Sequence, residues 1–227
     1  MFKKIRCILN KLFEKKLSSL TLMELFSNLE RFTAGIILDI LHNTKPPIDM
    51  NKIAYGFGIA ISIEGIGGHG ELLYDKNNEL SLIIINEDVE IRKQRYLIAY
   101  FIGRILIGSF VKKKYIHLRY DYSDIPSDGY SNEHIYATVF ATSILVPLNE
   151  LRNYIVKNDA SMSNIFDVDG NCISIRLYSN YAVNHVLKKI DYSLREHCEN
   201  ICLMIWILNM HQCDIKLNFI IKMNGYE

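Results

Sequence analysis

The chain has 227 residues, of which 49% are hydrophobic and 22% are charged. This composition is typical of a globular protein and excludes a disordered or collagen-like chain. Because the formal net charge is +1, no overall field requires nucleic acid or an acidic substrate as a partner, and any charged partner surface must be local. The five cysteines form no paired pattern, which favours a reducing, cytoplasmic environment over a disulfide framework.

A basic segment opens the chain, and we expect residues 1–44 to form an N-terminal helical leader. Apolar residues from Phe2 to Leu20 recur at helical spacing. The other faces carry Lys3, Lys4, Arg6, Lys11, Lys15 and Lys16. One interpretation is a helix packed on the domain with a solvated basic face. The alternative is contact with nucleic acid or an anionic membrane surface.

A second helix is expected over residues 22–42, ending before Pro46, since a residue that precedes proline resists helical geometry. Asp49 then caps a helix over 50–57, which Gly58 ends. No transmembrane segment is expected. The longest apolar run, residues 96–111, is shorter than the roughly 20 residues a span needs and contains Arg104.

Three short strands are expected next, followed by helices. The strands cover 59–63, 71–74 and 80–85, with turns at the glycine-rich segment and at Lys76-Asn77-Asn78. A helix over 92–110 is followed by a loop over 112–130, which Pro126, Asp128 and Gly129 indicate. The remaining expected helices cover 133–145 and 148–156. The remaining residues, 159–227, are expected to form a helical extension. It contains two small helices within 160–190, a helix over 194–210 and a terminal strand over 215–221.

Several motifs in this order resemble the ImmA/IrrE family of metallo-endopeptidases. They are Pro46-Pro47-Ile48-Asp49, the apolar strand Leu82 to Asn86, Lys93-Gln94-Arg95-Tyr96, the small residues Ala99 and Gly103, Tyr136-Ala137-Thr138-Val139-Phe140-Ala141, and Ile144-Leu145-Val146-Pro147. The resemblance extends over Pro46 to Ile190. It implies an α+β fold with a zincin-like core over residues 45–158, in which helices pack on a small three-stranded sheet.

The four positions that the family uses for zinc chemistry are all replaced. The two histidines of the zinc motif would fall on Tyr100 and Arg104, the catalytic glutamate on Phe101, and the third zinc ligand on Tyr136. An HExxH motif places two imidazoles one helical turn apart on one metal, and its glutamate activates the bound water. A guanidinium cannot bind zinc and phenylalanine cannot act as a base, so we expect no catalytic residues and no cofactor.

The replaced residues also predict what fills the site. Tyr100, Phe101 and Tyr136 would occupy the volume with aromatic surface. Arg104 would then need a carboxylate, because an unpaired buried cation is strongly unfavourable. Glu133, one turn before Tyr136, is the expected partner.

Other candidate sites remain open as alternatives. Possible zinc ligands gather near the C-terminus at His197, Cys198, Cys202, His211 and Cys213, although free cysteines often serve as core residues. Glu133 and His134 could form a rearranged metal site with His117. Cys172 and His185 could form a nucleophilic pair, although a structural cysteine is the simpler interpretation.

The predicted loop is rich in the residue types of binding hot spots. It contains Tyr115, His117, Arg119, Tyr120, Tyr122 and Tyr130. In the family fold it would lie beside the former active-site cleft. Contact with a partner is one interpretation, and a loop folded onto its own domain is the other.

The first functional hypothesis is therefore a catalytically inactive, regulatory relative of the ImmA/IrrE peptidases. Active members of that family act on helix-turn-helix repressors, often in mobile elements, phages and toxin–antitoxin pairs, so such a regulator is the expected protein partner. The second hypothesis is an active metallopeptidase with a relocated metal site. The third is a nucleic-acid or membrane-surface binder that uses the basic leader. The oligomeric state stays open.

Overall fold

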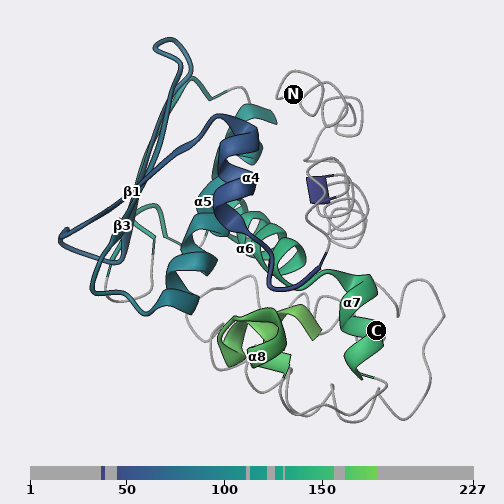
Figure 1. Cartoon of the computed structure of the whole chain (residues 1–227). Coiled ribbons are helices and arrows are strands. Elements are labelled where there is room, and N and C mark those ends of the chain that lie inside the picture. Colours follow the sequence, from purple (N-terminus) through teal and green to yellow (C-terminus); the bar gives the residue numbers. More distant parts are fainter. Residues whose placement is uncertain are drawn as a thin grey trace, which may run out of the picture.

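The computed structural model describes residues 37–38, 45–110, 113–121, 126–129, 131–155 and 162–177. It is a mixed α+β structure in which a four-stranded sheet carries its helices on one face (Figure 1). Of the predicted leader, only Ile37 and Leu38 fall within this part of the chain, and both are buried in the core. The helix and strand predicted over 194–221 lie outside the described residues.

Helix α4, Met50–Phe57, forms as its local signals predict. The side chain of Asp49 accepts a hydrogen bond from the backbone N–H of Lys52 at 3.1 Å. At the other end Gly58 adopts a left-handed conformation (φ 69°), and its N–H donates to the carbonyl groups of Ala54 and Tyr55. Both ends of the helix are therefore satisfied by residues within a few positions, which confirms the predicted bounds.

The sheet has four strands, and the prediction of three was wrong. The strands are β1 (Ala60–Glu64), β2 (Gly70–Asp75), β3 (Leu80–Asn86) and β4 (Tyr115–Tyr120), in the order β1-β3-β2-β4. β1 runs parallel to β3, whereas β2 is antiparallel to both of its neighbours. The first three strands match the predicted segments to within one or two residues.

β4 lies within the segment that was predicted to be a loop. Its residues alternate between exposed and buried, and Leu118 pairs with Leu72 of β2. Ile116, Leu118 and Tyr120 face inward, toward the helices. The strand forms because these inward side chains complete the apolar face of the sheet, while Tyr115, His117 and Arg119 face outward. The turn residues that predicted a loop come later, at 126–129.

Helices α5 (Ile91–Phe110) and α6 (Asn132–Leu145) pack together over the inner face of the sheet (Figure 1). They approach closely at Gly103, where an added Cβ would lie 3.1 Å from the Cα of Ala137. Ser131 caps α6 by accepting a hydrogen bond from the N–H of His134 at 3.2 Å. This close crossing positions the facing side chains of the two helices.

Two further helices, α7 (Leu148–Ile155) and α8 (Met162–Phe166), follow, and residues 170–177 are also helical. All agree with the predicted segments. Phe166, Val168 and Cys172 are buried in the same apolar cluster as α5 and α6. Within the described residues, no helix combines the length and the apolar character that crossing a membrane requires.

Candidate functional site

The four residues that the resemblance aligns with the zinc motif lie on the two packed helices. Tyr100, Phe101 and Arg104 belong to α5, and Tyr136 belongs to α6. The two aromatic residues on α5 are fully buried, Arg104 is 2% exposed, and Tyr136 is half-buried. Because Tyr100 and Arg104 are four positions apart, they lie on one face of α5.

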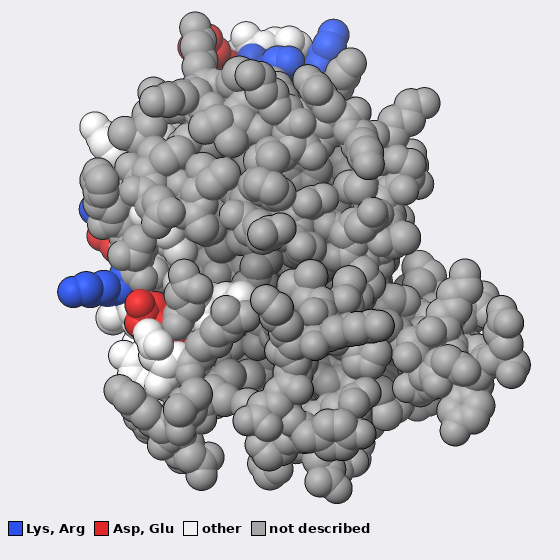
Figure 2. Space-filling view, turned by 90° about the vertical axis from the view of Figure 1, so that its right-hand side faces the viewer, with Lys and Arg blue, Asp and Glu red and all other residues white. Residues whose placement is uncertain are grey.

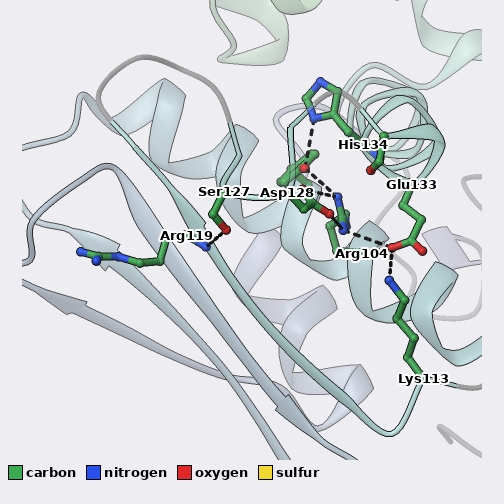
Figure 3. Close-up of polar contacts among 9 residues, drawn as sticks. Arg104, Lys113, Arg119, Ser127, Asp128, Glu133 and His134 are labelled. Atoms are coloured by element: carbon green, nitrogen blue, oxygen red, sulfur yellow. Dashed lines mark hydrogen bonds and ion pairs between the residues drawn. The ribbon is translucent and has the colours of Figure 1, made fainter.

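Arg104 is the centre of a cluster of charged side chains (Figure 3). Its Nη1 donates to Oδ1 of Asp128 at 3.3 Å, and its Nη2 donates to Oδ2 of the same residue. Nη2 also donates to Oε2 of Glu133 at 3.2 Å, which confirms the predicted pair. A further hydrogen bond joins Nη1 to the hydroxyl oxygen of Tyr100 at 3.3 Å. The buried guanidinium thus meets two carboxylates.

A second cation balances the cluster. Lys113, which follows the end of α5, donates from Nζ to Oε2 of Glu133 at 2.7 Å. Arg104, Lys113, Asp128 and Glu133 together carry no net formal charge. Although burial opposes the charge of Arg104, its hydrogen bonds to Asp128 and Tyr100 outweigh that effect and raise its pKa. The cluster is therefore an internally neutralised ionic network.

Asp128 is held in place by the turn that contains it. The N–H of Gly129 donates to the carbonyl of Pro126 at 2.8 Å, which closes the turn. Ser127 fastens the turn to β4, since its N–H donates to the carbonyl of Arg119 at 2.8 Å and its Oγ accepts from the N–H of Arg119 at 3.1 Å (Figure 3). The turn fastened to β4 thereby positions Asp128 next to Arg104.

Tyr100 connects the ionic network to His134. Its hydroxyl lies 3.1 Å from Nδ1 of His134. Because the Arg104 guanidinium can only donate, the Tyr100 oxygen accepts from it and the hydroxyl proton is left to donate to Nδ1. Burial, together with the charge of Arg104, lowers the pKa of His134 to about 4, so the imidazole is neutral at pH 7. Burial also raises the pKa of Tyr100, which keeps its phenol protonated.

This arrangement does not fit a catalytic zinc ion. A guanidinium, a protonated phenol and a phenyl ring stand at three of the four positions, and none is a zinc ligand at neutral pH. Within the ranges that the structure describes, no group of three or more His, Cys, Asp or Glu is placed to hold a metal. The C-terminal alternative, His197 to Cys213, lies outside those ranges.

The residues of the alternative, rearranged metal site lie on opposite sides of the sheet. His117 faces outward on β4 and hydrogen-bonds to Glu71 of β2, whereas His134 lies on α6, on the opposite side of the sheet. The structure therefore excludes the alternative in which His117 joins Glu133 and His134 at a metal ion. Cys172 is fully buried, and burial raises the pKa of its thiol, which disfavours a nucleophilic thiolate. His185 is not among the described residues.

The residues predicted to bind a partner also differ in their location. Tyr115 and Arg119 face outward on β4, whereas Tyr120 is 6% exposed and packs against Tyr100 with ring centroids 5.4 Å apart. Tyr120 is therefore part of the core. Tyr122 and Tyr130 lie outside the described residues. On the face shown in Figure 2, the described charged side chains are of both signs and lie at its margins, with no patch of one sign among them.

Sequence reasoning missed Asp128 and Lys113. Asp128 was used only as a turn signal, although a buried arginine requires carboxylates and this one lies shortly before α6. The missing information was β4, since that strand returns the chain to the sheet and sets the position of the turn.

No model of a known protein family matches the chain, and no curated protein sequence matches it either.

Proposed function

We propose that this protein is a catalytically inactive, ImmA/IrrE-like pseudopeptidase that acts as a protein-binding or regulatory module. The observation that carries the proposal is the Arg104 cluster. A guanidinium bonded to Asp128 and Glu133 stands where the resemblance would require a zinc-binding imidazole. Phe101, in the position of the general base, is fully buried and cannot take up a proton.

The proposed partner is a helix-turn-helix regulator, or another component of the same mobile-element, phage or toxin–antitoxin system. This part rests on the resemblance, since active members of the family act on such regulators. A chain that keeps the frame without the metal ligands would bind the regulator and leave it intact. The proposed contact surface is the exposed rim of the Arg104 cluster, where Lys113, Ser127 and Asp128 reach solvent.

Metal content tests the inactive state directly. Native mass spectrometry of untagged protein, purified without chelators, should give the mass of the chain alone. One zinc per chain would overturn the proposal and favour the relocated metal site. Glu133→Gln and His134→Asn variants, analysed alongside variants of the C-terminal cysteines, would then locate the ion.

Site-specific crosslinking tests the binding role. The photoreactive residue p-benzoylphenylalanine would replace Ser127 at the rim, and in a control protein it would replace Tyr55, which is 87% exposed on α4. Each protein would be irradiated with a purified helix-turn-helix regulator. A crosslinked, uncleaved regulator from position 127 but not from position 55 is expected. Equal yields, or cleavage of the regulator, would contradict the proposal.

A further inference from the structure

The two edges of the sheet differ in how their backbone groups are satisfied. β1 and β4 are the outer strands. At the β4 edge, the N–H of Ser127 donates to the carbonyl of Arg119, and the N–H of Arg119 donates to Oγ of Ser127. Pro126 forms a bridge with Tyr120 beside them, so the turn that follows β4 covers this end of its edge. Among the described strands, none pairs with the outer edge of β1.

Two residues of β1 direct their backbone groups to this open edge. In a parallel pair, residues that bond to the neighbouring strand alternate with residues whose N–H and C=O point away from it. The carbonyl of Glu64 accepts a hydrogen bond from the N–H of Glu87 at 3.1 Å, so the backbone of Glu64 points toward β3. The backbone groups of Ile61 and Ile63 therefore point outward. An edge of this kind is a template for pairing with a further strand.

An exposed apolar side chain lies at the same edge. Ile61 packs against the core, and Ile63 lies on the same face of the sheet, two residues further along β1. Ile85, which pairs with Ile63 in β3, is fully buried, whereas Ile63 is 56% exposed. β1 contains no proline or lysine, the residues that commonly block an exposed edge, and its one charged residue is Glu64 at its end. A strand added beside β1 would cover Ile63.

We infer that β1 pairs with β1 of a second copy of this chain, antiparallel, about a twofold axis perpendicular to the sheet. The two four-stranded sheets then join into one continuous sheet, with the helices of both copies on the same side of it. Ile61 of each copy exchanges backbone hydrogen bonds with Ile63 of the other. The inference is independent of the proposed function, because this contact uses no residue of the Arg104 cluster.

A second copy is favoured because β1 is complementary to itself. When the axis passes through Ser62, all five residues of the strand are paired. Ile61 then faces Ile63 on the inner side, which covers the exposed side chain twice. On the outer side Ser62 faces Ser62 of the second copy, and Glu64 faces Ala60, so no like charges are directly opposite. A register moved by two residues pairs fewer residues and separates Ile63 from Ile61.

The size of the contact determines the expected affinity. A pair of five-residue strands buries less than the roughly 800 Å² that each partner of a stable complex buries. The dimer should therefore dissociate at micromolar concentrations. Sedimentation velocity on the full chain from about 1 to 200 µM should show a reversible shift from monomer to dimer. A monomer throughout that range would overturn the inference and leave the edge of β1 to a strand of another protein.

Engineered cysteines test the register. In Ser62→Cys, the two new cysteines would form a pair without backbone hydrogen bonds between them, with Cα atoms about 4.5 Å apart, within the range of a disulfide. In Ala60→Cys, they would lie roughly 14 Å apart along the strands. Mild oxidation should crosslink the first variant and not the second. Both variants contain the same native cysteines, so equal crosslinking, or none at position 62, would overturn the inference.

A charge at the edge tests the contact without a covalent bond. Ile63→Lys should weaken dimerisation at least tenfold, because the ammonium group would be placed against Ile61 of the second copy. The matched control is Tyr115→Lys on β4, at the opposite edge of the sheet, where the original side chain is 58% exposed. It should leave the dissociation constant unchanged. Circular dichroism would establish that both variants fold. A folded Ile63→Lys protein that dimerises like the original chain would overturn the inference.

Discussion

The two halves of α5 carry arginine clusters that differ in their access to water. In the first half, Arg92 and Arg95 both pair with Asp167, which follows α8, and the side chains of Arg92, Arg95 and Asp167 are 32%, 17% and 33% exposed. In the second half, Arg104 is 2% exposed and pairs with Asp128 and Glu133. The first cluster fastens α8 to α5, whereas the second fills the space between α5 and α6.

The difference shows how burial changes the energetic role of the same residue type. Water solvates a half-exposed arginine when its carboxylate is removed, so such pairs contribute little to stability. Water cannot solvate a buried guanidinium in this way, so removing its carboxylate partner is strongly unfavourable. The second cluster should therefore control the stability of the fold, and the first should act as a local fastening. Four measurements would test this contrast.

Neutralising both carboxylates around Arg104 should have the largest effect. The double variant Asp128→Asn/Glu133→Gln keeps the shape of the site but leaves the guanidinium without a counter-charge. We expect a loss of about 3–5 kcal/mol in the free energy of unfolding, measured by urea denaturation. Glu133→Gln alone should cost less, because Asp128 remains.

The control is Arg104→Met, which removes the cation and leaves two partly exposed carboxylates beside Lys113. It should cost less than the double variant, because the carboxylates can reach water. If the double variant unfolds at the same urea concentration as the original chain, Arg104 is not the buried cation that the contrast requires.

The close crossing of α5 and α6 should be the next most sensitive feature. Gly103→Val would push side-chain atoms into Ala137 and Phe140, whose Cδ1 lies 2.9 Å from the position of an added Cβ. Overpacking of this kind should lower the free energy of unfolding by about 2–3 kcal/mol. In Gly170→Val, nothing lies within 4 Å of the added Cβ. Equal effects at both positions would contradict the close crossing of α5 and α6 at Gly103.

Acid should destabilise the second cluster through His134. Its pKa of about 4 in the fold is below the ordinary value of about 6.5, so the unfolded chain binds more protons between these values. The contribution is complete above about pH 6.5 and is lost as the pH falls toward 4. Between pH 7 and pH 5 we expect a loss of about 1–2 kcal/mol that the His134→Asn variant lacks. Parallel stability curves for the two proteins would refute this assignment.

The partly exposed cluster should give the smallest effect. Asp167→Asn removes the carboxylate that Arg92 and Arg95 share. It should cost about 1 kcal/mol, because Arg92 reaches water and Arg95 keeps its hydrogen bonds to the carbonyl groups of Ile48 and Phe166. Chemical denaturation in low and high salt would check it, because salt screens an exposed pair more than a buried one. A loss as large as that of the Asp128/Glu133 variant would remove the contrast between the two halves of α5.

Elements with complete local signals could be predicted closely. The capping side chain of Asp49 and the left-handed Gly58 determine the ends of α4, and the apolar run of β3 marks a strand. In both cases the deciding contacts join residues a few positions apart or follow from the apolar character of the segment itself. The need of Arg104 for a carboxylate could also be predicted, because it depends only on the cost of burying a charge.

β4 and Asp128 could not be recognised in the same way. The alternation from Tyr115 to Tyr120 is present in the sequence, but the turn residues that follow favoured a loop over the whole segment. The strand is stabilised by β2, more than 40 positions earlier, as the pairing of Leu72 with Leu118 shows. Asp128 meets Arg104 only because β4 carries the chain back to the sheet.

The sequence by itself determined the identity and approximate bounds of most described helices, three of the four strands, and the need of Arg104 for a carboxylate. These follow from local propensity, from periodicity and from the chemistry of single side chains. The tertiary structure decided the fourth strand and the second carboxylate on Arg104. Each of these depends on strand order and register, which bring together residues far apart in the chain and assign every strand residue to one face.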